Sequence, residues 1–510
     1  MVRSLPREQI QFLIKIRVQF LTQRFGERGS AMTLYESLAQ RFIDDIVCER
    51  LPIGARLPAL RQLAQQQGVS VTTAGKAYDY LADRGWIYAR PQAGYFVASR
   101  SQIAEFPALS SHSLTPRDPS RFAPVQGYNS GLTGFTPLGT SLLAPALLPE
   151  VDLARTIKRV TRRASQSMFS YPESQGLESL RQALSEHFRE NHFAFNAEEL
   201  VITNSCLDSV RIALECLTEP QDAIAVCSPC FSGLLDLLTT LKRQIIEIPV
   251  THEGIDLHAL ETCFAGQKVS AALLSTTHVN PLGITLPTQQ KQAIAALASK
   301  YKMPIIEDDV YFELSHQKEK PLPAKYWDTD GYILWCSSIS KVLAPGLRLG
   351  WCLPGRYFDK FYGHHSYTSM GVNSLVQACI AEFILCGDYR NHINKVRPIL
   401  QSQVHLYRQF LAEHLPSSAQ ISAPQGGLVL WLRIPGVDTN QLADEARKVG
   451  VDIRRGSCFS THPDYNDCLR INCGWPLYLK VERDSAQMQL QGLCELVQSL
   501  KGSDSEENAV

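Results

Sequence analysis

The chain has 510 residues, 45% of them hydrophobic and 20% charged, and its 50 basic residues balance its 50 acidic ones. This length is too great for one ordinary hydrophobic core and predicts roughly three structural units. The zero net charge excludes any argument from overall charge for a nucleic acid or membrane partner, although a few placed Lys or Arg residues suffice for phosphate contacts.

The distribution of apolar and cysteine residues predicts a protein of the cytoplasm that has no membrane partner. No window approaches the roughly 18 uninterrupted apolar residues of a membrane span, and Lys15 and Arg17 interrupt the apolar run near the N-terminus, so no signal peptide is expected. The 14 cysteines are scattered through apolar segments, as buried thiols are in a reducing compartment. Cys227 and Cys230 form a C-x-x-C pair without a second Cys or His pair, so we expect no metal site.

Residues 1–32 form an N-terminal extension with two open interpretations. Residues 1–31 carry six basic and two acidic side chains, and the segment is either a basic arm or sequence ahead of a translation start at Met32. A clear pattern begins directly afterwards. It is a helical stripe of four apolar residues, Leu34, Leu38, Phe42 and Ile46.

Residues 33–100 have the pattern of three helices followed by a hairpin. Pro52 and Gly54 follow the first helix, and "PALRQLAQQQ" predicts a short second helix before a break at Gly68. Ser70 is a suitable N-cap for a third helix in "VTTAGKAYDYLADRG". "WIYARPQAGYFV" predicts a hairpin with its turn near residues 92–94. This order of elements predicts a winged helix-turn-helix.

The rest of the chain predicts a linker and then an α/β domain. Residues 101–123 are rich in Ser and Pro without a period, which is typical of a linker. In residues 124–500, short apolar runs alternate with helical segments, which predicts a mostly parallel sheet with helices on both faces. The runs lie at 200–203, 223–227, 271–275, 304–308, 332–336 and 347–353. A smaller α+β subdomain is expected from about residue 390, and a disordered polar tail at 501–510.

Polar residues follow several of these predicted strands. Asn280 comes after the run at 271–275, and Asp308 and Tyr311 come at the end of the next run. Lys341 follows the run at 332–336. Because ligands bind outside the carboxyl ends of strands in open α/β sheets, we expect these groups to converge on one edge.

The residue types match the needs of pyridoxal 5′-phosphate. A lysine such as Lys341 can hold an aldehyde as a Schiff base. Asp308 can keep a pyridine nitrogen protonated, so that the ring works as an electron sink. Asn280 and Tyr311 can meet a ring hydroxyl. A phosphate needs a helix N-terminus, hydroxyls and an arginine, and these are available from residues 205–207, Ser338 and Arg348.

Four segments resemble the fold-type I aminotransferases: "YPESQGLESLR" (171–181), "NPLG" (280–283), "EDDVY" (307–311) and "SSISKVLAPGLRLGW" (337–351). Joined to the winged helix, the chain resembles the MocR (GabR-like) subfamily of GntR-family bacterial transcription regulators. The resemblance spans about residues 33–500. The full set of motifs in this order is specific, whereas any single motif is weak.

The resemblance implies roles for the residues of the α/β domain. Lys341 would form the internal aldimine and Asp308 would pair with the pyridine nitrogen. Asn280 and Tyr311 would meet the ring oxygen, and Phe231 would stack on the ring. The phosphate would be bound by Ser338, Arg348, the amides of Cys206 and Leu207, and Tyr171 of a partner subunit.

The use of Tyr171 by a partner subunit implies a homodimer. Arg470, in "CLRINCGW", would bind the carboxylate of a substrate or effector. In the winged helix, the residues that the family turns towards DNA are Arg61, Thr72, Thr73 and Lys76. The N-terminal residues of a recognition helix are those that reach base edges.

The chain departs from the family pattern in three places. The phosphate turn, often Gly-Ser-Gln-Gln, is "SCLD" here, so the glutamine side chain is missing. Val279 stands where Gln is usual before Asn280. Val71 and Gly75 stand where arginine is common. These changes bear on details around the cofactor and the DNA, and leave Lys341 and its neighbours intact.

Each residue taken alone also has a plainer interpretation. Lys341 is then a surface lysine, Asp308 a helix cap, and Phe231 a residue of the core. Arg470 is then part of a structural ion pair. The motifs in their common order favour the cofactor site over these interpretations.

Three functions therefore compete. The first is a regulator that binds double-stranded operator DNA and uses pyridoxal phosphate to sense an amine or amino-acid effector. The second is an active aminotransferase with a vestigial or moonlighting DNA-binding domain. The third is a regulator that has lost the cofactor. The intact Lys341 and Asp308 disfavour the third and the complete winged helix disfavours the second, so the first is preferred.

Overall fold

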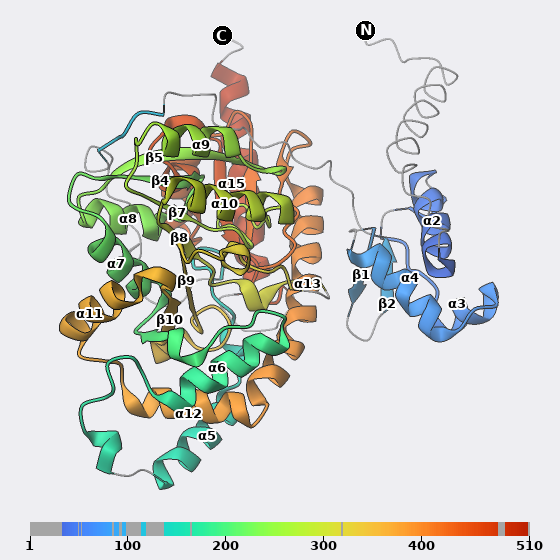
Figure 1. Cartoon of the computed structure of the whole chain (residues 1–510). Helices are drawn as coiled ribbons and strands as arrows, with labels where there is room; N and C mark the ends of the chain where they lie inside the picture. Colours follow the sequence, from blue (N-terminus) through green and yellow to red (C-terminus); the bar gives the residue numbers. More distant parts are fainter. Residues whose placement is uncertain are drawn as a thin grey trace. The chain divides into compact units, whose positions relative to one another are not determined.

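A computed structural model of the chain describes residues 33–48, 50–52, 54–83, 86–90, 94–97, 114–118, 137–163, 166–317, 320–477 and 485–507. The chain divides into two compact units, Met1–Ala98 and Ser99–Val510, and each is described by itself (Figure 1). In these described ranges no helix has the length and apolar character needed to cross a membrane. The predicted extension at 1–32, the hairpin turn at 91–93 and most of the predicted linker lie outside the described residues.

The N-terminal unit contains the predicted helix-turn-helix and hairpin. Its elements are α2 (Leu34–Val47), α3 (Leu60–Gln67), α4 (Val71–Asp83), β1 (Ile87–Arg90) and β2 (Gly94–Val97). Gly68 ends α3 with a φ of 65°, a left-handed conformation that glycine adopts readily. Tyr78 and Leu81 of α4 are fully buried in the core of this unit. Leu34, expected on the buried stripe of α2, is instead 63% exposed.

The larger unit is built on an eight-stranded mixed sheet of order β3-β10-β9-β8-β7-β4-β5-β6. The neighbours from β9 to β5 are parallel, whereas β10 is antiparallel to both β9 and β3. The strands are β3 (Val201–Thr203), β4 (Ala223–Ser228), β5 (Gln244–Thr251), β6 (Gly254–Ile255), β7 (Ala271–Leu274), β8 (Ile305–Asp308), β9 (Ile333–Ser338) and β10 (Gly350–Leu353). The predicted mostly parallel sheet is confirmed, and β5 is a strand that the sequence pattern did not indicate.

Helices cover both faces of this sheet, as predicted (Figure 1). One face packs on α9 (Leu257–Ala265) and α10 (Thr288–Tyr301). The other packs on α7 (Cys206–Leu217), α8 (Ser232–Thr240) and α11 (Phe358–Ser369). Burial on both faces explains why the strands are apolar along their whole length.

A third apolar cluster joins the end of the sheet that carries β9 and β10 to further helices. Trp335 and Trp351 of these strands pack there with residues from each helix. The helices concerned are α6 (Glu178–Glu190), α12 (Ser374–Leu385) and the first part of α13 (Asp388–His414). A separate helix, α5 (Glu150–Arg162), packs on α12.

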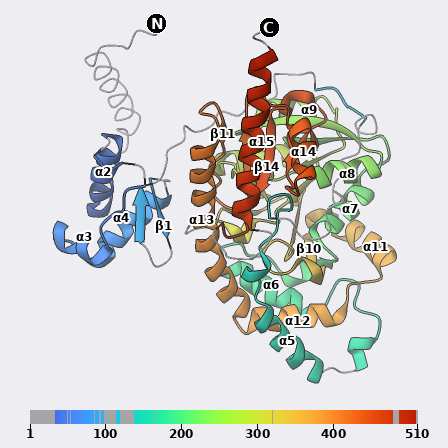
Figure 2. The same ribbon diagram turned by 180° about the vertical axis from the view of Figure 1, so that it is seen from behind.

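The predicted smaller subdomain is a four-stranded antiparallel sheet of order β11-β12-β14-β13 with helices beside it. Figure 2 shows α14 and α15 with this sheet and α13 nearby. Its elements are β11 (Gln420–Ile421), β12 (Val429–Arg433), α14 (Thr439–Lys448), β13 (Arg454–Arg455), β14 (Cys468–Asn472) and α15 (Ala486–Glu507). The helix α15 therefore continues into the tail that was expected to be disordered from residue 501.

Candidate cofactor and effector site

The carboxyl ends of the central parallel strands bring the predicted acid and hydroxyl to one edge of the sheet. Asp308 is the last residue of β8 and Ser338 the last of β9, and both are buried. Asp308 pairs with Cys336 of β9 in the sheet register. The loop that leaves β9 carries Lys341. This edge is where ligands bind in open α/β sheets.

The amine of Lys341 lies inside the site. Its Nζ donates to the carbonyl oxygen of Ser141 at 3.0 Å and lies 3.4 Å from Ser141 Oγ. The pKa of Lys341 is lowered to about 8, chiefly by burial and then by the positive charge of Arg470, while Asp308 raises it and Arg348 lowers it. A lysine with such a pKa has a substantial neutral fraction near neutral pH, as a nucleophile needs.

Asp308 is held in a buried, charged setting. Burial raises the pKa of its carboxyl, while a hydrogen bond from Cys206 and the charge of Lys341 lower it. The Cys206 thiol lies 3.1 Å from Asp308 Oδ1. The thiol and the ammonium group of Lys341 therefore favour the ionised form of Asp308, against the effect of burial.

A chain of hydrogen bonds connects the residues expected around the ring oxygen. The hydroxyl of Tyr311 lies 3.0 Å from Ser141 Oγ and 3.4 Å from Asn280 Nδ2. Asn280 Oδ1 accepts from Arg470 Nη1 at 3.3 Å. The structure therefore brings Lys341, Tyr311, Asn280 and Arg470 together through Ser141 and one another.

Arg470 comes from β14 of the smaller subdomain and is only 4% exposed. Its Nη2 donates to the carbonyl oxygen of Gly139 at 2.6 Å, and its guanidinium lies over the ring of Phe459, 5.3 Å from the ring centre. These contacts set a buried cation beside Lys341. Such a cation suits a carboxylate ligand.

Ser141 and Gly139 belong to the segment 137–148, in which no sequence pattern predicts a site. Ser141 is 3% exposed and contacts both Lys341 and Tyr311. A serine and a glycine in an irregular segment carry no pattern that marks such a role. A small apolar cavity beside Lys341 is lined by Leu142, Leu143, Pro145, Leu148, Ser340, Leu343 and Pro345.

The N-terminus of α7 approaches the same edge. Ser205 caps it, because its Oγ accepts from the amide of Asp208 at 3.1 Å. Cys206 is buried, while Leu207 is 42% exposed. A Cβ on Gly350 of β10 would lie 2.4 Å from the carbonyl carbon of Ser205, so only a glycine lets α7 come this close.

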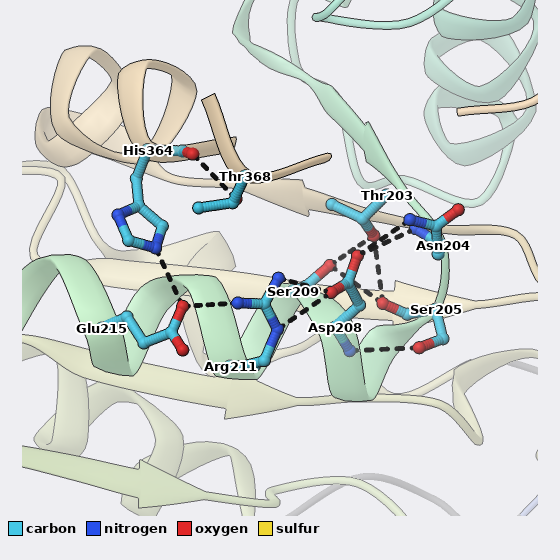
Figure 3. Close-up of polar contacts among 9 residues, drawn as sticks. All are labelled: Thr203, Asn204, Ser205, Asp208, Ser209, Arg211, Glu215, His364 and Thr368. Carbon is cyan, nitrogen blue, oxygen red and sulfur yellow. Dashed lines mark hydrogen bonds and ion pairs between the residues drawn. The ribbon is translucent and has the colours of Figure 1, made fainter. Parts of the chain in front are cut away.

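Figure 3 shows the polar contacts of Asp208, in the predicted phosphate turn whose usual glutamine is missing. The carboxylate of Asp208 accepts from the amide of Asn204 at 3.2 Å and from Arg211 Nη2 at 2.9 Å. Arg211 also binds Glu215, and Glu215 binds His364 of α11 at 2.8 Å. The negative charge of Asp208 at this turn is therefore paired with a cation and supports the helix end.

The remaining predicted phosphate and ring residues differ in how far they are exposed. Ser338 Oγ accepts from the amide of Ser340 at 3.4 Å. Arg348 is exposed and has a φ of 47°. Phe231 precedes α8, is half-buried and packs against the apolar cluster between the sheet and α7, α8 and α11. Tyr171 is 83% exposed.

The predicted DNA-binding residues lie on α3 and the start of α4. Arg61, Thr72 and Lys76 are exposed. The amide of Thr73 donates to Ser70 Oγ at 3.0 Å, and the two hydroxyls lie 2.8 Å apart, so Ser70 caps α4 as predicted and Thr73 takes part in the cap.

The C-x-x-C pair is buried in the sheet region. Cys227 and Cys230 are at most 4% exposed, and burial raises the pKa of the Cys227 thiol to about 11. No group of three or more His, Cys, Asp or Glu side chains in the described part of the chain is arranged to hold a metal ion.

Comparison with known proteins gives two family matches. Residues 34–97 match the gntR family of bacterial regulatory proteins, and residues 145–476 match aminotransferase class I and II. The HTH-type transcriptional regulator YjiR of Escherichia coli is 34% identical over 88% of this chain and 96% of its own length. The regulator YdcR of the same species is 32% identical over 87% of the chain and 96% of its own length.

Solved structures share the fold of the larger unit. A multiple-substrate aminotransferase from Thermococcus profundus matches with a TM-score of 0.65 at 22% identity, over 72% of this chain and 92% of its own. The α-aminoadipate aminotransferase LysN of Thermus thermophilus, solved with N-(5′-phosphopyridoxyl)-L-leucine, matches with a TM-score of 0.65 at 20% identity, over 71% and 92%. With both families matched in this order and two regulators similar over nearly their whole lengths, the chain belongs to the MocR subfamily of GntR-family transcription regulators, which join a helix-turn-helix domain to an aminotransferase-like domain.

Proposed function

We propose that this transcription regulator binds pyridoxal 5′-phosphate at Lys341, senses a small amine or amino acid there, and reports it to operator DNA. The observation that carries the proposal is the setting of Lys341. Its amine has a pKa lowered to about 8, it interacts with the buried acid Asp308, and it lies near the buried cation Arg470. A structural lysine needs neither the acid nor the cation.

The residues fit the cofactor. Lys341 would hold its aldehyde carbon, Asp308 its ring nitrogen, and Tyr311 and Asn280 its ring oxygen. The bound group would supply an aldehyde that exchanges amines and a ring that accepts electrons. Its phosphate would lie against Ser338, Arg348 and the amides of Cys206 and Leu207, with Phe231 stacked on the ring and Tyr171 supplied by a second copy.

The effector would be held by its amine and its carboxylate. Arg470 would bind the carboxylate, and the amine would replace that of Lys341. The segment 137–148 touches both Lys341 and Arg470 through Ser141 and Gly139. An effector that displaces these contacts would change how the segment and β14 of the smaller subdomain sit against the large sheet.

Residues 114–118, which belong to the predicted linker, would carry a change in this subdomain towards the DNA-binding unit. Arg117 exchanges two backbone hydrogen bonds with Ile245 of β5, and its Nη1 donates to the carbonyl oxygen of Thr461 at 2.9 Å. Glu247 of β5 accepts from Thr461 Oγ1 at 2.6 Å and from Ser460 Oγ at 2.7 Å. The predicted linker is therefore anchored to both parts of the larger unit, so a shift between them would reach it. Such a shift acts as a switch only if the effector binds the arrangements of the subdomain before and after the shift with different affinity.

On the DNA side, we propose that α4 enters the major groove of double-stranded operator DNA with Thr72 and Lys76, supported by Arg61 and the cap at Thr73. A homodimer would place two such helices on two half-sites. The exposed Tyr171 supports a surface that a second copy covers. Such a regulator would act in the cytoplasm, where bacterial DNA is found.

The test begins with the absorption spectrum of the purified protein. We expect a visible cofactor band, fixation of the cofactor to Lys341 by borohydride, and loss of both in Lys341→Ala. A panel of amines and amino acids should contain one that changes both the band and the affinity for operator DNA. A protein without a band after incubation with pyridoxal phosphate would have lost the cofactor, and the proposal would fall.

An active aminotransferase is the second candidate, because the same lysine can serve as a proton-transferring base at its pKa of about 8. Repeated conversion of an amino acid to its oxo acid at a rate above that of Lys341→Ala would favour it. Thr72→Ala combined with Lys76→Ala then separates the two roles. It should weaken operator binding and leave the band unchanged.

A further inference from the structure

The side chain of Cys206, the first residue of α7, contacts the acid at the end of β8. Its Sγ lies 3.1 Å from Oδ1 of Asp308, and both residues are buried. A carboxylate only accepts hydrogen bonds and a thiol can donate one, so the thiol is the donor. The phosphate role expected of Cys206 uses its backbone amide and leaves this side-chain contact unassigned.

The surroundings keep the thiol protonated and therefore able to donate. Burial, followed by the negative charge of Asp308, raises the pKa of Cys206 well above its ordinary value. On Asp308 the effects are opposed, since burial raises the pKa of the carboxyl and the bond from Cys206 lowers it. The thiol thus favours the ionised form of an acid whose pKa is raised by its buried position.

The fold fixes where this thiol lies. Ser205 caps α7, which makes Cys206 the first helical residue. Gly350 of β10 lets the backbone at residues 205 and 206 come against the sheet, because a Cβ there would lie 2.7 Å from the amide nitrogen of Cys206. Asp308 is held from the other side as the last residue of β8, paired with Cys336. The contact follows from two rigid elements.

We propose that Cys206 is a positioning residue that holds Asp308 as an oriented, charged carboxylate for the pyridine nitrogen of the bound cofactor. The inference rests on the proposed function, because Asp308 has this task only when pyridoxal phosphate is present. With one oxygen engaged by the thiol, the carboxylate has a fixed rotation and keeps its charge. A charged Asp308 holds a proton on the ring nitrogen more firmly than a neutral Asp308 would.

The test compares Cys206→Ala, Cys206→Ser and Cys352→Ala in the full-length protein loaded with pyridoxal phosphate. The serine variant restores a hydrogen-bond donor. Cys352, a buried thiol of β10 that lies 3.7 Å from Cys336 Sγ, controls for lost packing. The readouts are the pH at which the visible cofactor band changes and the dissociation constant of the cofactor.

The visible band reports loss of the proton from the nitrogen that joins Lys341 to the cofactor, and in Cys206→Ala we expect its midpoint to rise by about half a pH unit. One neutral hydrogen bond is lost, so Asp308 holds the ring proton less firmly. A ring with less positive charge then depresses the pKa of the joining nitrogen less. The cofactor should also dissociate roughly threefold more readily. Cys206→Ser should return both values to those of the unaltered protein, and Cys352→Ala should leave the midpoint where it was.

An unmoved midpoint in Cys206→Ala, or a serine variant that behaves like alanine, overturns the role of Cys206 alone. A purely structural role predicts equal losses of stability in both alanine variants and no change in midpoint. If the unaltered protein shows no band at all, the cofactor proposal fails first and this inference with it, so the two failures are distinguishable.

Discussion

The amine of Lys341 donates a hydrogen bond to the carbonyl oxygen of Ser141, 3.0 Å away. The segment that carries Ser141 is tied to β14, since Asn472 Nδ2 donates to the carbonyl oxygens of Pro137 and Leu142 at 2.9 and 3.0 Å. Arg470 of the same strand binds Gly139 in that segment. One short segment therefore connects the lysine to the strand that carries the arginine proposed for the effector.

The first prediction concerns the protonation of Lys341. Its pKa is about 8 partly because Arg470 disfavours a second positive charge nearby. Removal of that charge in Arg470→Gln should therefore raise the pKa of Lys341 by about half a pH unit. The pKa of Lys341 is measured by competitive acetylation of the cofactor-free protein across a pH series. Mass spectrometry quantifies the acetylated peptide that contains Lys341.

The neutral amine is the form that reacts, so acetylation of Lys341 should increase through pH 8 and require a higher pH in the variant. Arg433→Gln is the matched control, because Arg433 lies on neighbouring β12 and pairs with Asp467 at 2.7 Å. Its Lys341 profile should coincide with that of the unaltered protein. A profile that stays in place or moves to lower pH in Arg470→Gln would contradict the electrostatic account.

The second prediction concerns the close approach of β10 to α7. In Gly350→Ala the new Cβ would lie 2.4 Å from the carbonyl carbon of Ser205, and backbone cannot move aside as a side chain can. We expect the free energy of unfolding of the larger unit to fall by about 1–3 kcal/mol. Chemical denaturation measures this change.

Gly346→Ala, four residues before Gly350, serves as the control, because a Cβ there meets nothing within 4 Å. Its unfolding free energy should stay within about 0.5 kcal/mol of the unaltered protein. Equal losses of unfolding free energy in the two variants would show that the close contact between residue 350 and the backbone of Ser205 does not require a glycine.

The third prediction concerns the bases that α4 contacts. Val71 opens this helix, is 49% exposed and has no side-chain donor, so it is suited to the methyl group of a thymine. In the best DNA site selected by the full-length protein, uracil in place of the contacted thymine should weaken binding about fourfold, the value of one buried methyl group.

Val71→Ala should remove most of this sensitivity to uracil. Leu34→Ala changes another exposed apolar residue of the same unit, 63% exposed on α2, and should keep it. Gel-shift titrations at a fixed salt concentration measure the affinities. A site in which no thymine-to-uracil change affects binding would show that Val71 does not contact a thymine methyl group.

The fourth prediction concerns communication between the effector and the DNA. Arg117 joins the predicted linker to Thr461. Arg117→Ala should therefore reduce the change in operator affinity that the effector causes. The cofactor band and the affinity for DNA without effector should remain. Arg447→Ala, on the exposed face of α14 where Arg447 pairs with Asp444, is the control. Full coupling in Arg117→Ala would exclude this route.

Much of the fold could be predicted because the signals are local. The runs at 223–227, 271–275 and 332–336 are apolar along their length and became buried parallel strands, as burial on both faces requires. The helix-turn-helix followed from periodicity, the break at Gly68 and the cap at Ser70. By contrast β5 was missed, because "QIIEIPVT" carries a glutamate and a proline, and Glu247 is buried only through partners that lie far along the chain.

The candidate site could be predicted in its residue types and not in its contacts. The sequence by itself determined that a lysine, an acid, an asparagine and a tyrosine follow strands of one mostly parallel sheet, because each apolar run and the polar residues after it form a local pattern. Only the tertiary structure decided that Ser141 meets Lys341 across 200 residues and that the Cys206 thiol meets Asp308 across 102. Such contacts depend on how helices and subdomains pack on the sheet, and a hydrogen bond between distant residues leaves no trace in the pattern of either segment.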